Sequence, residues 1–81
     1  MSDGKDFRSV LLEHEPVELY KILKFEGLVE SGAQAKQVID EGLVRVNGDV
    51  ETRRRRKIVS GDIVEFEDHQ LRPVLQTGRA S

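Results

Sequence analysis

The dipeptide Asn47-Gly48 is the feature of this sequence that most narrows its fold. It follows Val44-Arg45-Val46, where apolar and polar residues alternate with the period of a strand. Asn and Gly both tolerate the positive φ angles that tight hairpin turns need. A β-hairpin is therefore predicted here, directly after Gly42, a residue type common at helix ends.

The register of this hairpin depends on the length of its loop. A two-residue loop would set Val46 opposite Asp49. It would also set Val44 opposite Glu51. A three-residue loop instead sets Val46 opposite another valine and places Arg45 across from Glu51, a favourable pair on the solvent face. The longer loop is predicted, because it matches apolar with apolar residues.

A helix is predicted between Ser31 and Gly42. Ser31 with Gln34 three residues later is a capping-box pattern, in which the hydroxyl accepts a free backbone N–H and the amide reaches back. Lys36 and Asp40 are four residues apart and are expected to form an exposed pair. The expected buried side consists of Ala35, Val38 and Ile39.

An earlier helix is predicted over Val17–Phe25 and is expected to end at Gly27. Pro16 suits the first helical position, since its missing N–H would have no partner there. The apolar stripe with helical spacing is Leu19, Ile22 and Leu23. Tyr20 and Phe25 adjoin this stripe and are capable of stacking on bases, but we expect them in the core.

Three further strands are predicted on either side of this central region. Phe7–Leu12 is interpreted as an edge strand, with a short helical turn as the alternative. A turn at Ser60–Asp62 leads into a strand at Ile63–Phe66. Leu71–Leu75 is predicted as a last strand, which Pro73 would confine to an edge because proline lacks an N–H.

The chain of 81 residues has room for one domain. We expect residues 7–75 to form it and residues 1–6 and 76–81 to be flexible ends. The predicted fold class is α+β, with two short helices packed on one face of a small, mostly antiparallel sheet.

Charge is unevenly distributed along the chain. Lys and Arg total 13, Asp and Glu total 15, and the net charge of −2 argues against a protein that coats nucleic acid with its whole surface. Five consecutive cations nevertheless occupy Arg53–Lys57, between two predicted strands. Arginine suits bidentate phosphate contacts and base stacking, so this run is the principal candidate for binding a polyanion.

Other classes of function find little support in the sequence. There is no cysteine, so disulfides and thiolate zinc sites are excluded. His14 and His69 lack the spacing of a metal site, and no nucleophile motif is present. We expect no catalysis and no cofactor. No apolar run is long enough to cross a bilayer, and a cytoplasmic protein without membrane contact is expected.

The order of these parts over residues 17–66 resembles the RNA-binding domain first described in ribosomal small-subunit protein four, the "S-four" domain or alpha-L motif. The resemblance is closest to the small stand-alone bacterial members of this family. It rests on glycines at fixed offsets from a helix and a hairpin. The matching pieces are Leu19–Leu23, Gly27, Ser31–Lys36, Ile39, Gly42, Leu43–Gly48 and Ser60–Asp62.

The resemblance implies binding to structured RNA through the exposed side of the second helix and the loop after the hairpin. The RNA is a ribosomal, transfer or small RNA, and its identity stays open. Carried over residue by residue, the implied contacts are Ser31, Gln34, Lys36, Arg45, Arg53, Arg54, Arg55, Arg56 and Lys57. Members of this family commonly have an arginine after the capping serine, but this chain has Gly32 there. The resemblance therefore implies a weaker RNA contact from the helix and a larger contribution from the arginine run.

Structural explanations and rival functions stand beside this interpretation. Ser31 is explained by its cap alone, and a block of like charges is often only a solvated loop. The chain, expected to be a monomer, would also serve as a protein-interaction adaptor with an acidic partner, or as the RNA-targeting subunit of a ribonucleoprotein. A β-grasp carrier, which part of the pattern resembles, is disfavoured because such carriers finish in Gly-Gly and this sequence finishes in Gly78-Arg79-Ala80-Ser81.

Overall fold

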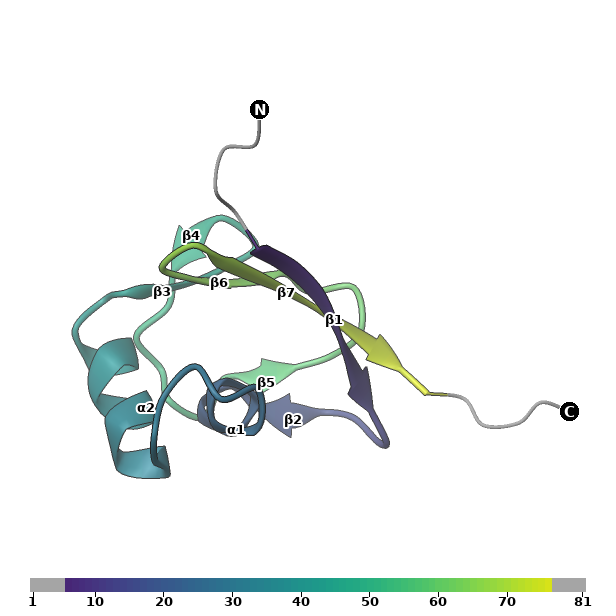
Figure 1. Cartoon of the computed structure of the whole chain (residues 1–81), viewed down its shortest axis with the longest axis horizontal. Coiled ribbons are helices and arrows are strands. Elements are labelled where there is room, and N and C mark those ends of the chain that lie inside the picture. The colour runs from purple at the N-terminus through teal and green to yellow at the C-terminus, as the bar shows by residue number, and fades with distance from the viewer. Residues whose placement is uncertain (1–5, 77–81) are drawn as a thin grey trace, which may run out of the picture.

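The structure, a computed structural model, describes residues 6–76. Two helices lie on one side of a five-stranded sheet in the order β1-β7-β6-β3-β4, and β2 pairs with β5 in a separate ribbon (Figure 1). The elements are β1 Asp6–Leu12, β2 Val17–Glu18, α1 Leu19–Phe25, α2 Gly32–Asp40, β3 Val44–Val46, β4 Asp49–Val50, β5 Lys57–Ile58, β6 Val64–Phe66 and β7 His69–Leu75. The predicted fold class is confirmed, since every strand pair except the parallel β1–β7 pair is antiparallel.

The core lies between the helices and the inner face of the sheet. Its fully buried members come from both helices and from the strands facing them: Leu19, Ile22, Leu23, Ala35, Ile39, Val44, Ile58, Val64 and Leu71. Burying these side chains supplies most of the stability of such a small domain. Val38, predicted on the buried side of α2, is only partly buried against this core.

The second helix forms as predicted. The hydroxyl of Ser31 accepts the backbone N–H of Gln34 at 3.1 Å, and Gly42, with φ of 78°, follows the last turn. The Gln34 side chain reaches one residue further back than a capping box requires. Its Oε1 accepts the N–H of Glu30 at 2.7 Å.

The first helix is shorter than predicted. It begins at Leu19, because Val17 and Glu18 are extended and pair with β5. Pro16 therefore precedes β2 rather than opening the helix, and its peptide bond to Glu15 is cis. Gly27, with φ of 73°, follows the end of the helix as expected.

The predicted register of the hairpin is wrong. The observed turn contains only two residues, with Asn47 at φ 55° and Gly48 at φ 89°, and Val46 lies opposite Asp49. Arg45 consequently lies opposite Val50 instead of Glu51. Two consecutive positive φ angles match the twist of the flanking strands, which outweighs the apolar pairing that favoured a longer loop.

The position of Pro73 also differs from the prediction. β1 is an edge strand as expected, but it pairs with β7, so β7 lies inside the sheet. Pro73 is tolerated because β6 pairs with β7 only as far as Leu71. The carbonyl of Pro73 accepts the N–H of Gly61 in the turn before β6. The missing N–H of Pro73 therefore faces this turn and not a paired strand.

The predicted flexible ends fall mostly outside the described residues. Residues 1–5 and 77–81 are not described. Asp6 already belongs to β1, and the N–H of Gln76 donates to the carbonyl of Leu12 at 2.8 Å. The described residues therefore include one residue beyond each predicted boundary.

Candidate nucleic-acid interface

The basic loop, defined as Arg53–Lys57, begins with a tight turn. The N–H of Arg56 donates to the carbonyl of Arg53 across 3.2 Å, which places Arg54 and Arg55 at the tip. Among the described residues, the Arg55 side chain has no hydrogen-bond or ion-pair partner, and it is exposed. The tip thus presents one unpaired guanidinium group beside a paired one.

The backbone of the basic loop is tied to the start of α1. The carbonyl of Arg56 accepts the N–H of Leu19 at 2.9 Å, and the carbonyl of Arg54 accepts the N–H of Tyr20 at 3.2 Å. These are the first N–H groups of the helix, and Glu18 provides no side-chain cap for them. Because the loop caps the helix, the packed helix in turn holds the loop in place.

Glu51 anchors two of the arginine side chains. Its carboxylate is only 7% exposed and accepts Nε and the backbone N–H of Arg53, each at 2.9 Å. It also accepts Nη2 of Arg53 at 3.1 Å and Nη1 of Arg56 at 2.8 Å. The hydrogen bonds from Arg53, with help from Arg56, lower the pKa of Glu51 from 4.5 to about 2. The carboxylate is therefore fully charged at neutral pH and fixes both guanidinium groups.

Asp40, at the end of α2, holds Arg54. Nε of Arg54 lies 3.2 Å from Oδ1 and Nη2 lies 2.7 Å from Oδ2, a bidentate pair. The hydrogen bonds from Arg54 lower the pKa of Asp40. The predicted pair between Lys36 and Asp40 is not what forms, since the Lys36 ammonium lies 4.7 Å from the centre of the Tyr20 ring. Lys36 and Arg54 nevertheless line one shallow hollow beside α2.

The structure does not bring all the predicted contacts together. Arg45 is exposed on β3 between two buried valines, which places it on the outer face of the sheet, away from the helices. Lys57 is in β5 and lines a different cavity, with His14 and Lys21. The predicted contacts that the structure brings together beside α2 are Lys36 and Arg54, with Arg53 and Arg55 adjoining Arg54 in the chain. Arg56 lies next to them and is more covered.

Ser31 and Gln34 are at the start of α2, and their oxygens are engaged in the helix cap. Both side chains are exposed, so their remaining donors face solvent. Their structural role is confirmed by these hydrogen bonds, and contact with RNA stays a prediction for both.

The cluster keeps a net positive charge after these pairs are formed. The basic loop carries five cations, against the two carboxylates of Glu51 and Asp40. The side chains of Arg53 and Arg54 remain 72% and 51% exposed. A guanidinium has five N–H donors, and each of these two uses only part of its set on a carboxylate. Carboxylates hold Arg53, Arg54 and Arg56, and they leave donors of these groups available in fixed directions.

Residues 6–76 contain no group of three or more His, Asp or Glu side chains arranged to hold a metal ion. Neither of the two helices described is long and apolar enough to span a membrane.

The fold and the basic loop together define the class of this protein. The chain matches the S4 domain model over residues 10–73, and it belongs to that family. The resemblance drawn from the sequence is confirmed.

Particular relatives are also similar over most of their length. The chain is 55% identical over 62 residues to "Putative RNA-binding protein YbcJ" of Escherichia coli (strain K12), covering 76% of this chain and 89% of that protein. It is 36% identical over 58 residues to "Probable ribosome maturation protein RlbA" of Bacillus subtilis (strain 168), covering 72% and 82%. The solution structure of YbcJ from E. coli, described as revealing an alfaL motif involved in RNA-binding, superposes with a TM-score of 0.61. It shares 50% identity and covers 91% of each chain.

Glu51 is the residue that the sequence interpretation missed. It was expected on the solvent face, across from Arg45. The two-residue loop, the alternative set aside, places Glu51 opposite Val44, a core residue. With that register, an acidic residue facing inward two positions before Arg53 would have pointed to a buried ion pair.

Proposed function

We propose that this protein binds structured RNA, without catalysis, through the basic loop and the exposed side of α2. The family and the names of its relatives support the ligand class, since those names describe RNA binding and ribosome maturation. The proposed role uses no cofactor and no membrane. We place it in the cytoplasm of a bacterium, with ribosomal, transfer or small RNA as the partner and a second protein of a ribonucleoprotein as a further one.

The observation that carries the proposal is the set of guanidinium groups held by carboxylates while still exposed. Arg53 and Arg54 each donate from Nε and Nη2 to the two oxygens of one carboxylate, and they keep other N–H groups for a ligand. A long side chain that is already fixed loses less conformational entropy on binding, so the entropic cost of binding is smaller. Arg55, unpaired at the tip, is free to adapt to the ligand.

The proposed mechanism is contact with phosphates combined with recognition of shape. We propose that Lys36, Arg53, Arg54 and Arg55 bind phosphates of a folded RNA, because its paired stems hide their base edges in a deep, narrow major groove and expose the backbone. With about four phosphates neutralised, the slope of log affinity against log salt is expected to be roughly −3. Base-specific reading is not part of the proposal.

The test removes the tip of the loop and spares its anchors. Arg54→Ser with Arg55→Ser is expected to weaken binding of a labelled transfer RNA and of a labelled RNA hairpin on the order of tenfold. The salt slope is expected to become less steep by about 1.5, because two phosphate contacts are lost. Fluorescence anisotropy across a salt series measures both quantities. Arg53 and Arg56 are left in place, because their loss would leave the buried carboxylate of Glu51 without partners.

Arg72→Ser is the matched control. Arg72 is an exposed arginine on β7 that contacts Gln70 and the Phe7 ring, so its removal takes away a cation far from the loop. Equal losses in the tip variant and the control would contradict the proposed site. The rival function, an adaptor for an acidic protein partner, predicts a different result in a competition experiment. In that case an excess of heparin would displace folded RNA as completely as it displaces single-stranded RNA.

A further inference from the structure

Phe25 is the last residue of α1, and its side chain is 67% exposed. It was expected in the core together with Tyr20. Tyr20 does pack against the core, but Phe25 does not. The ring therefore presents a large aromatic face to solvent.

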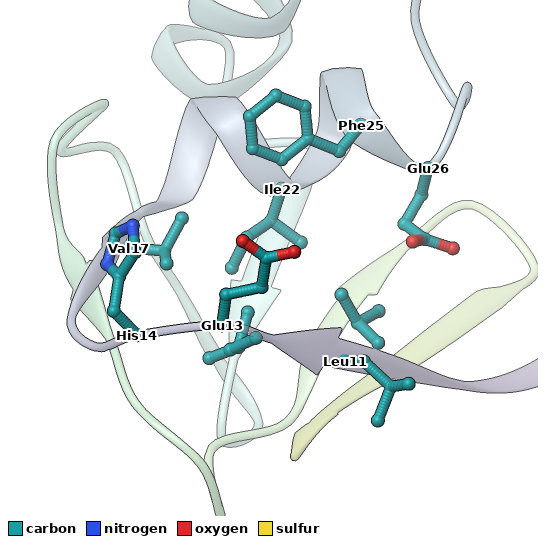
Figure 2. A pocket seen from close by; sticks show the side chains of 9 residues that line it. Leu11, Glu13, His14, Val17, Ile22, Phe25 and Glu26 are labelled. Atoms are coloured by element: carbon teal, nitrogen blue, oxygen red, sulfur yellow. The ribbon is translucent and has the colours of Figure 1, made fainter. Parts of the chain in front are cut away.

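Phe25 lines two hollows of opposite charge, both of which also include His14 and Val17 in their walls. One is a cleft of about 370 Å³ between β1 and α1, rimmed by the carboxylates of Glu13 and Glu26. Figure 2 shows this cleft, with the ring extending from α1 toward the side of His14 and Val17. The other is a cavity of about 280 Å³, which we call the Phe25 cavity. Its walls include Lys21 and Lys57.

The composition of the Phe25 cavity suits a nucleotide. The ring of Phe25 and the ring of Pro16 supply apolar surface, while His14, Lys21 and Lys57 supply donors. Its one carboxylate, Glu18, lies 3.7 Å from the Lys21 ammonium, with the Lys21 side chain 46% exposed and the Glu18 side chain 24% exposed. A base stacks on an aromatic ring whatever its identity, and its phosphate is drawn to ammonium groups.

The Phe25 cavity shares Lys57 with the basic loop. Lys57 is the last residue of that loop and also the first residue of β5, where it pairs with Glu18 of β2. Lys57 therefore belongs to the basic loop in sequence and to the wall of the Phe25 cavity in space. The acid-rimmed cleft would repel a phosphate chain.

We propose that the Phe25 cavity holds one unstacked nucleotide of the bound RNA, with its base on the Phe25 ring and its phosphate between Lys21 and Lys57. This inference rests on the proposed function, because the RNA reaches the cavity from the basic loop. It adds a preference for RNA with an unpaired base beside a folded stem. A fully paired duplex satisfies the loop but leaves the ring bare.

Phe25→Trp provides a direct test, because the chain contains no tryptophan and the new side chain would be a single reporter. A hairpin RNA with an unpaired loop is expected to quench the fluorescence of the introduced indole, and a fully paired duplex of the same length is not. Phe7→Trp is the control, since Phe7 is 55% exposed on β1, on the other face of the sheet. The fluorescence of this control is expected to stay unchanged with either RNA.

Affinity gives the second measurement. Phe25→Ala is expected to weaken binding of the hairpin about fivefold or more and to leave duplex binding unchanged, whereas Phe25→Tyr keeps the ring and the affinity. Unquenched fluorescence with tight hairpin binding by anisotropy would overturn the nucleotide site and leave the proposed function standing. Equal quenching by the duplex would also overturn it. Failure of the unaltered protein to bind either RNA would instead remove the proposed function itself.

Discussion

The basic loop and the outer face of the sheet both display exposed arginines, but they hold them differently. On the loop, Arg53 and Arg54 are each fixed by two side-chain hydrogen bonds to a carboxylate. On the outer face, Arg45 has no hydrogen-bond or ion-pair partner among the described residues, and the side chains around it include Glu65 and Glu67. Arg53 and Arg54 are thus oriented by carboxylates, whereas Arg45 is oriented by none within the described part of the chain.

The support beneath each region explains this difference. The loop is bonded through its backbone to the start of α1, and a buried carboxylate lies directly under it. The outer face is one side of a regular sheet, where side chains stand out singly and only neighbours across the strands restrain them. A cluster of cations therefore becomes a binding surface when the fold uses carboxylates and backbone groups to hold it.

Glu51→Gln should produce the largest effect among these variants, because it removes the carboxylate that holds the basic loop. The variant keeps the shape of the side chain but removes the charge that Arg53 and Arg56 share. The free energy of unfolding is expected to fall by about 2 to 3 kcal/mol at neutral pH, as the lowered pKa of Glu51 implies. Urea denaturation measures it. Glu41→Gln, at an exposed residue bonded only to Gln37, is the control and should change stability by less than about 0.5 kcal/mol.

The same substitution should change the response to acid. Because folding lowers the pKa of Glu51 from 4.5 to about 2, its contribution to stability is present above pH 4.5 and is lost as the pH falls toward 2. The unaltered protein should therefore lose more stability than Glu51→Gln over this interval. Parallel curves for the two proteins would show that Glu51 does not hold the loop.

Much of the fold was open to prediction from the sequence. Ser31, Gly42 and Asn47-Gly48 each act through local backbone geometry, so their roles in a cap, a helix end and a turn depend little on the rest of the chain. The arginine run was visible as composition. These signals sufficed for the fold class and for the family.

The remaining features depend on tertiary contacts that local patterns do not contain. The start of α1 was misplaced because Val17 and Glu18 pair with β5, far along the chain. The position of Pro73 was misjudged because β1, from the other end of the chain, pairs with β7. The partners of the arginines were missed because one of them, Asp40, lies on another element and the other, Glu51, was given the wrong register.

Asp40→Asn should raise RNA affinity, whereas the removal of an arginine from the basic loop lowers it. The variant releases Arg54 from its bidentate pair and adds one unit of net positive charge beside α2. RNA affinity is expected to rise about threefold, with a salt slope steeper by about 0.7 to 0.9, because one more cation is available to phosphate. Anisotropy with the labelled hairpin measures both values.

A fall in affinity for Asp40→Asn would carry a distinct meaning. It would show that Arg54 must be oriented by its carboxylate before it binds, so that orientation outweighs charge. Gln37 lies on the same helix and is exposed, and Gln37→Glu serves as the control that adds an acid nearby without touching Arg54. It should weaken binding modestly.

Arg45→Ser should have the smallest effect, although the family resemblance places Arg45 among the RNA contacts. The residue stands on the outer face of β3, beside Glu65 and Glu67, and the helices and the basic loop's anchors lie on the inner side. Removing it is expected to change RNA affinity less than twofold and to leave the salt slope unaltered, whereas Arg55→Ser lowers the slope by about 0.7 to 0.9. Both single variants remove one exposed, unpaired arginine, so they differ only in where the charge is held. A slope that falls equally in the two would mean that the RNA wraps across the sheet edge, and that the loop alone does not define the binding surface.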